Sequence, residues 1–123
     1  MMALMLMAAA AGSVCDDAVT QQDLNACAQA EFERADAALN VQWEVTADAM
    51  KARDAAAEPD DGRPGYFAVL LDAQRSWIEY RDRHCVSEGY YARGGSMEPM
   101  LVSFCRAELT DARTAQLADL IAQ

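Results

Sequence analysis

The sequence predicts an all-α fold, an antiparallel bundle of three main helices with a long first helix, stapled by two disulfides. Apolar residues recur at three- and four-residue steps in three stretches, and no stretch alternates with the two-residue period of a strand. The chain contains four cysteines, an even number. Its length of 123 residues allows one domain with one modest core and is too short for two.

The first 14 residues contain no charged side chain. An apolar, methionine-rich run leads into residues 8–13, where small side chains resemble a signal-peptide cleavage zone. We therefore expect a signal peptide over residues 1–14, although it lacks a basic start, and a single helical domain over residues 15–123. The run is shorter than the roughly 20 apolar residues of a spanning helix. We also expect no stable membrane span in the mature chain. Bulky Val14 argues against a lipid on Cys15.

The first helix is expected over residues 20–56. Thr20 can accept a hydrogen bond from a free backbone amide at the helix start, and Asp23 complements the helix dipole. The helix is expected to stop before residues 58–65, a linker with two prolines and two glycines. Its expected buried face consists of Leu24, Cys27, Ala28, Phe32, Ala35, Leu39, Trp43, Thr46 and Met50.

A second helix is expected over residues 66–86, followed by a glycine-rich loop over residues 87–95. The stripe of this helix consists of Phe67, Leu70, Leu71, Gln74, Trp77, Ile78, Arg81 and Cys85.

Ser96 is placed to cap the third helix, and Glu98 and Pro99 suit its first turn. The expected buried face of this helix consists of Leu101, Phe104, Cys105, Leu109, Ala112, Leu117 and Leu120.

Four cysteines after a signal-like segment predict two disulfides, for which three connectivities exist. Cys85 closes the second predicted helix and Cys105 lies near the start of the third, which favours the pair Cys85–Cys105 and leaves Cys15–Cys27. Helical periodicity does not exclude the other two connectivities. We expect no metal site and no cofactor, because no CxxC spacing occurs and the one histidine, His84, adjoins a cysteine.

Arg81 lies on an apolar stripe, and a buried charge of this kind needs an anionic or carbonyl partner. Asp36 is the expected partner, while Asn40 and Gln74 are expected to form hydrogen bonds between helices and Trp77 to pack in the core. These five residues are predicted to form a structural clamp. A binding role for Arg81 is the alternative interpretation.

Tyr90 and Tyr91 lie in the predicted glycine-rich loop. Exposed aromatic side chains often anchor protein interfaces. They are therefore the candidate contact residues for a partner.

The formal net charge of -10 is concentrated in residues 1–62, which hold 12 acidic and 3 basic side chains. This distribution argues against nucleic acid and favours a basic protein as partner. A solvated face that keeps the protein soluble is the alternative interpretation. No catalytic residues are predicted, because no serine lies in a GxSxG elbow and the lone histidine adjoins a cysteine expected in a disulfide. We therefore expect a binding protein and not an enzyme.

Several segments together resemble a known family, in this order and spacing: Cys15, TQQDLNAC at residues 20–27, ADAALN at residues 35–40 with Trp43, QRSWIEYRD at residues 74–82 with Cys85, GGS at residues 94–96, Cys105, and LTDARTAQL at residues 109–117. They resemble the LprI-like lysozyme-inhibitor family, formerly a domain of unknown function in exported bacterial proteins. The resemblance runs from Cys15 to Leu117. Trp43 departs from it, because a tyrosine is expected there.

The resemblance implies a small helical protein, periplasmic or secreted, that binds c-type lysozyme and inhibits it by non-covalent occlusion. Because c-type lysozyme is strongly basic, the acidic first half of the chain would speed the encounter. The resemblance assigns no contact residue. The alternative is a structural or envelope-stress accessory protein that binds an endogenous periplasmic partner.

Overall fold

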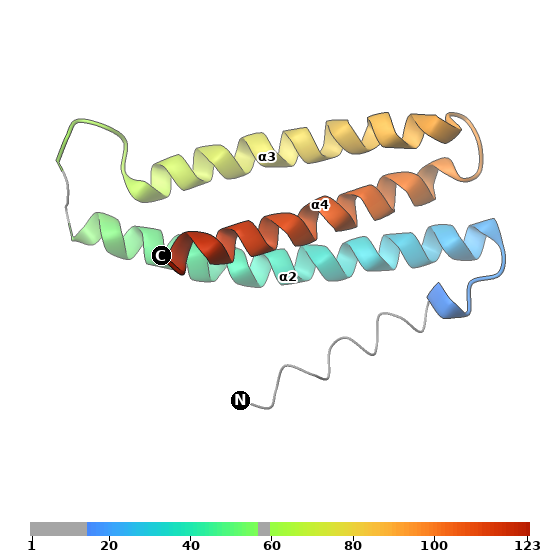
Figure 1. Ribbon diagram of the computed structural model, residues 1–123, viewed down its shortest axis with the longest axis horizontal. Coiled ribbons are helices and arrows are strands. Elements are labelled where there is room, and N and C mark those ends of the chain that lie inside the picture. The colour runs from blue at the N-terminus through green and yellow to red at the C-terminus, as the bar shows by residue number, and fades with distance from the viewer. Residues whose placement is uncertain (1–14, 57–59) are drawn as a thin grey trace, which may run out of the picture.

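The computed structural model describes residues 15–56 and 60–123, so the expected signal peptide over residues 1–14 lies outside the described residues. The chain forms three long helices, α2 (Gln21–Ala55), α3 (Tyr66–Gly89) and α4 (Glu98–Ile121), and a short 3-10 helix, η1 (Tyr90–Ala92). α3 runs antiparallel to both α2 and α4 (Figure 1). No strand occurs in this part of the chain. The predicted all-α bundle of three main helices is confirmed.

The first helix, α2, has 35 residues, which corresponds to about 52 Å at 1.5 Å per residue. It begins with a capping box: Thr20 Oγ1 accepts a hydrogen bond from the Asp23 amide at 3.0 Å, and Asp23 Oδ2 accepts one from the Thr20 amide at 3.4 Å. The predicted helix start at Thr20 is therefore confirmed. The last turns of α2 extend beyond the end of α4 (Figure 1).

The second helix is longer than expected, because α3 continues through Gly89 and then into η1. Gly89 is buried, and a Cβ at this position would come within 2.5 Å of Val102 Cγ2 on α4. This glycine therefore permits a close approach of two helices and does not mark a loop. The turn comes later, at Gly94, whose φ of 80° is a conformation that favours glycine.

The third helix begins differently from the prediction. Met97, and not Ser96, occupies the N-cap position, and its side chain forms no capping hydrogen bond. Glu98 in the first turn reaches back, so that its Oε1 accepts a hydrogen bond from the Gly94 amide at 3.2 Å. Pro99 lies in the first turn as expected.

The hydrophobic core lies between the three helices. Its buried members are Leu39, Met50, Leu70 and Leu117, with Trp43, Phe67, Trp77 and Ile121 packed against them. Thr46 on α2 is also buried, and its hydroxyl donates a hydrogen bond to the Leu117 carbonyl of α4 at 2.9 Å. Phe104 and Leu120, expected on the buried face of the third helix, are each 37% exposed.

Across residues 15–56 and 60–123, no helix is both long enough and apolar enough to span a membrane.

Candidate functional site at the disulfide-bonded end

Both disulfides lie at the end of the bundle where α2 begins and α3 connects to α4 (Figure 1). Cys15 is bonded to Cys27, with 5.0 Å between their Cα atoms, and Cys85 is bonded to Cys105, with 5.4 Å between theirs. The favoured connectivity is therefore confirmed and the two alternatives are excluded. The first bond holds the N-terminal segment on α2, and the second joins α3 to α4.

Side-chain hydrogen bonds also fix the α3–α4 connection to the start of α2. Asn25 on α2 donates from Nδ2 to the Ser96 carbonyl at 2.9 Å. Gln21, one turn earlier, donates from Nε2 to the Asn25 Oδ1 at 2.9 Å and lies 3.5 Å from the sulfur of Met100. This end of the bundle is therefore held by two covalent bonds and by polar contacts between elements that are distant in sequence.

The α3–α4 connection presents two aromatic side chains to solvent. Tyr91 is 87% exposed and Tyr90 is 49% exposed. Both belong to η1, which follows α3 directly, whereas the sequence predicted a glycine-rich loop over residues 87–95. The guanidinium of Arg93 lies 4.6 Å from the centroid of the Tyr90 ring. The role of Tyr90 and Tyr91 in contacting a partner stays a prediction.

Acidic side chains occupy the same end. We define the tip surface as the exposed residues Asp16, Asp17, Val19, Asp23, Tyr90 and Tyr91. Its two tyrosines lie on η1, directly after α3, whereas its three aspartates and its valine lie on the start of α2 and on the segment before it, on the other side of this end of the bundle (Figure 1). Exposed aromatic side chains are typical anchors of protein-binding surfaces, and exposed carboxylates at the same end of the molecule favour a basic partner.

The predicted clamp lies in the middle of the bundle and not at the tip surface. Arg81 is buried, with 8% of its surface exposed. Its Nε donates to Asp82 Oδ1 at 3.0 Å, and its Nη1 lies 3.4 Å from the Thr110 hydroxyl of α4, with which it forms a hydrogen bond. Its guanidinium also lies 5.1 Å from the Trp77 ring centroid. Arg81 is thus engaged within the bundle.

The structure does not bring Asp36 and Arg81 together, which corrects the expected pairing. Phe32, one turn before Asp36 on α2, places its ring 5.2 Å from the Arg81 guanidinium. Arg81 therefore meets an aromatic ring on α2 and takes its carboxylate partner, Asp82, from its own helix. Asn40 is exposed, and no hydrogen bond joins it to another helix in the described part of the chain.

Gln74 is buried and links two helices, because its Oε1 accepts a hydrogen bond from Arg113 Nε of α4 at 2.9 Å. Sequence reasoning missed Asp82 and Arg106, whose Nε lies 3.5 Å from Asp82 Oδ1. The Cys85–Cys105 disulfide is the signal that could have found this pair. It places the turn before Cys85 beside the residue after Cys105.

One cluster of potential metal ligands does not form a three-ligand site. His84, Glu88 and Cys105 place one donor atom each within 4.8 Å of one another. The sulfur of Cys105 is bonded to Cys85, and metal binding by cysteine requires a thiolate.

A family model described as lysozyme inhibitor LprI matches residues 15–117. An uncharacterized protein of Rhizobium meliloti (strain 1021) is 49% identical over 108 residues, which cover 87% of this chain and 78% of that protein. No solved structure matches the chain significantly. The matched segment includes all four cysteines and both tyrosines of the tip surface. The chain belongs to the lysozyme inhibitor LprI family.

Proposed function

We propose that this protein is an exported inhibitor that binds c-type lysozyme and blocks it by non-covalent occlusion. Residues 1–14 serve as its signal peptide and residues 15–123 form its single domain. Membership of the LprI family supports a lysozyme-inhibitor-like function. The two disulfides support a periplasmic or secreted location, because such bonds persist mainly in oxidising compartments.

The observation that carries the proposal is the tip surface. An occluding inhibitor needs a contact surface that loses little conformational freedom on binding, because ordering flexible groups costs affinity. Tyr90 and Tyr91 satisfy this requirement, since they lie on a 3-10 helix directly after α3, within the segment closed by Cys85–Cys105. Their rings supply apolar contact area, which is the usual role of interface tyrosines.

Charge supplies the second part of the argument. The chain has a formal net charge of -10, and c-type lysozyme is strongly basic. Asp16, Asp17 and Asp23 are exposed and belong to the segment before α2 and the first turn of α2, at the same end of the bundle as the connection from α3 to α4 (Figure 1). Complementary charge raises the association rate and orients the two proteins before contact. The proposed inhibition is binding alone and assigns no residue a catalytic role.

A cell-wall turbidity assay tests the proposal. The purified protein, in micromolar excess over a c-type lysozyme at low salt, is expected to slow the clearing of a bacterial cell-wall suspension. A lysozyme of another structural class but similar basic charge serves as the control, because charge alone would affect both enzymes equally. Unchanged clearing by c-type lysozyme under these conditions would contradict the proposal.

A second candidate function rests on the outer face of α2. Val41 is 68% exposed and Val45 is 50% exposed, and both lie beside the exposed carboxylates of Glu44 and Asp48. An apolar strip of this kind suits an accessory protein that binds an endogenous periplasmic partner. Recovery of one native partner from periplasm, lost in a Val41→Asp/Val45→Asp variant while lysozyme stays unaffected, would favour this alternative.

A further inference from the structure

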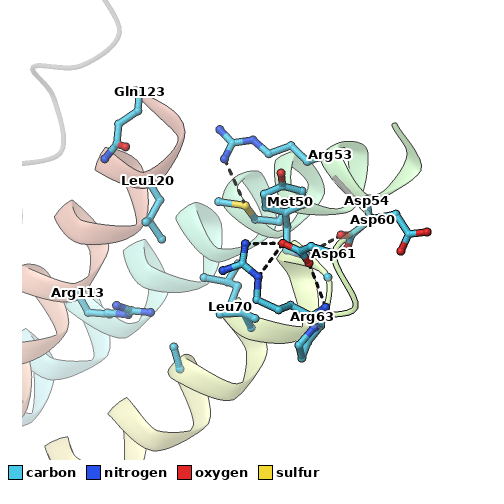
Figure 2. Close-up of a pocket in the computed structure, with 15 residues that line it drawn as sticks. Met50, Arg53, Asp54, Asp60, Asp61, Arg63, Leu70, Arg113, Leu120 and Gln123 are labelled. Atoms are coloured by element: carbon cyan, nitrogen blue, oxygen red, sulfur yellow. Dashed lines mark hydrogen bonds and ion pairs between the residues drawn. The ribbon is translucent and has the colours of Figure 1, made fainter. Parts of the chain in front are cut away.

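A cleft with a volume of about 920 Å³ lies at the end of the bundle opposite the tip surface. The last turns of α2, residues 60–65 of the α2–α3 connection, the start of α3 and the end of α4 surround it (Figure 2). Its apolar lining includes Met50, Pro64, Val69, Leu70 and Leu120. The volume falls within the range of roughly 300–1,000 Å³ that small-molecule sites occupy.

Arg113 provides a positive charge on the α4 side of this cleft. Its Nε donates to Gln74 Oε1 at 2.9 Å and its Nη1 to Gln116 Oε1 at 3.2 Å. These two amide oxygens orient the guanidinium but do not neutralise it, and none of the carboxylates in the described part of the chain pairs with it. Desolvation lowers the pKa of Arg113, which means that its charged form is held at a cost.

The carboxylates around the cleft have other partners or lie away from Arg113. Asp54 accepts hydrogen bonds from the backbone amides of Tyr66 at 2.7 Å and of Phe67 at 3.1 Å, at the start of α3. Asp61 accepts one from Arg63 Nε at 2.7 Å. Figure 2 shows these two aspartates together on the side of the α2–α3 connection, across the cleft from Arg113.

We propose that this cleft binds a small amphiphile with a single carboxylate head and an apolar body, such as a medium-chain fatty acid. The carboxylate accepts hydrogen bonds from Arg113, whose Nη2 has no other partner in the described part of the chain, and so neutralises the desolvated guanidinium. The apolar body covers Leu70, Leu120 and Met50. Two other arginines line the cleft, but Arg63 is paired with Asp61, and the Arg53 guanidinium lies against the Tyr66 ring and the Met50 sulfur.

Calorimetric titration of the purified protein with sodium decanoate below its micelle concentration tests the proposal. We expect saturable binding with one site per chain. Decanol, which has the same apolar body and no charge, is expected to bind about tenfold more weakly, since a hydrogen-bonded ion pair is lost. Arg113→Gln is expected to weaken decanoate binding by a similar factor and to leave decanol binding unchanged.

A second pair of variants keeps the test independent of the Gln74–Arg113 contact. Val69 is 55% exposed and lines the cleft, whereas Val86 is 41% exposed on α3 and lies outside it. Val69→Glu places a carboxylate at the cleft and is expected to weaken decanoate binding about tenfold, while the matched control Val86→Glu is expected to bind decanoate normally. Neither result depends on whether lysozyme is inhibited.

Three outcomes would overturn the proposal. The first is no saturable decanoate binding up to about 1 mM. The second is equal affinity for decanoate and decanol, or for the wild type and Arg113→Gln. The third is a dimer in sedimentation that Val69→Glu dissociates and Val86→Glu does not, which would assign the cleft to a second copy of the chain.

Discussion

The guanidinium of Arg81 lies 5.1 Å from the ring centroid of Trp77, one helical turn earlier on α3. The same group lies 5.2 Å from the Phe32 ring of α2, and its Nη1 forms a hydrogen bond with the Thr110 hydroxyl of α4. One side chain therefore contacts all three helices. This position makes Arg81 a residue on which their relative arrangement depends.

Replacing Arg81 is expected to destabilise the fold. Arg81→Ala removes the stacked guanidinium and leaves Asp82 without its closest partner, so we expect the free energy of unfolding to fall by about 2–4 kcal/mol. Urea denaturation followed by circular dichroism measures this change. Arg83→Ala is the control, because the Arg83 side chain is 81% exposed. Equal stability of the two variants would show that Arg81 does not hold the helices.

Asp82 is expected to contribute to stability because its carboxylate forms ion pairs with two arginines. Its Oδ1 lies 3.0 Å from Arg81 Nε and 3.5 Å from Arg106 Nε. Asp82→Asn leaves both guanidinium groups without a carboxylate, and because Asp82 is partly exposed we expect a loss of only about 1–2 kcal/mol. The matched control is Glu79→Gln, whose ion pair with Arg83 is exposed. Melting curves that coincide for the two variants would contradict this role.

A side chain at position 89 is expected to destabilise the fold. A Cβ would come within 2.5 Å of Val102 Cγ2, and a β-branched valine in a helix has little rotamer freedom with which to move away. We expect Gly89→Ala to lower stability by about 1–2 kcal/mol despite the better helix propensity of alanine.

The double variant Gly89→Ala/Val102→Ala tests the cause of this effect. In the Val102→Ala background, Gly89→Ala should lower the free energy of unfolding much less than it does in the wild type, because the overlapping methyl group is gone. Thermal unfolding of the four proteins in the cycle provides the measurement. Purely additive effects would show that the contact with Val102 is not the reason for a glycine here.

A substitution on the tip surface is expected to weaken lysozyme binding without changing the stability of the fold. Tyr91 is 87% exposed, so Tyr91→Ala should keep the melting temperature and weaken lysozyme binding at least about tenfold if it is an anchor. Tyr80→Ala is the control, since Tyr80 is also exposed but lies on the outer side of α3. Biosensor measurements would show the difference. Normal lysozyme binding by Tyr91→Ala would show that the contact surface lies elsewhere than the tip surface. This conclusion would hold even if the protein inhibits lysozyme.

The helices, the first capping box and the disulfide pairing follow from local rules. Thr20 and Asp23 stand at the spacing of a capping box, and periodic apolar residues place Cys85 and Cys105 at one end of the bundle. Other features depend on tertiary contacts that local rules do not capture. Gly89 resembles a loop signal in sequence, yet it is buried because α4 passes close to it.

The partner of Arg81 illustrates the same limit. Neighbouring residues on a helix do not normally face one another, so pattern reasoning favours a carboxylate on another helix over Asp82. Asp82 pairs with Arg81 because Phe32 fills the facing part of α2 and Arg106 approaches from α4. The periodic pattern of apolar residues could not predict the cleft, because three helices and a connection meet there.

No disulfide joins the part of the chain before residues 60–65 to the part after them, so the backbone is their one covalent link. One bond closes within residues 15–27 and the other within residues 85–105, so neither spans the exposed connection at residues 60–65. A protease site introduced there should, after cleavage, yield two chains that separate on a denaturing gel without reductant and yet elute together from a native sizing column. After cleavage the two parts would be held together only by non-covalent contacts, which include the hydrogen bonds from Asn25 to Ser96 and from Thr46 to Leu117.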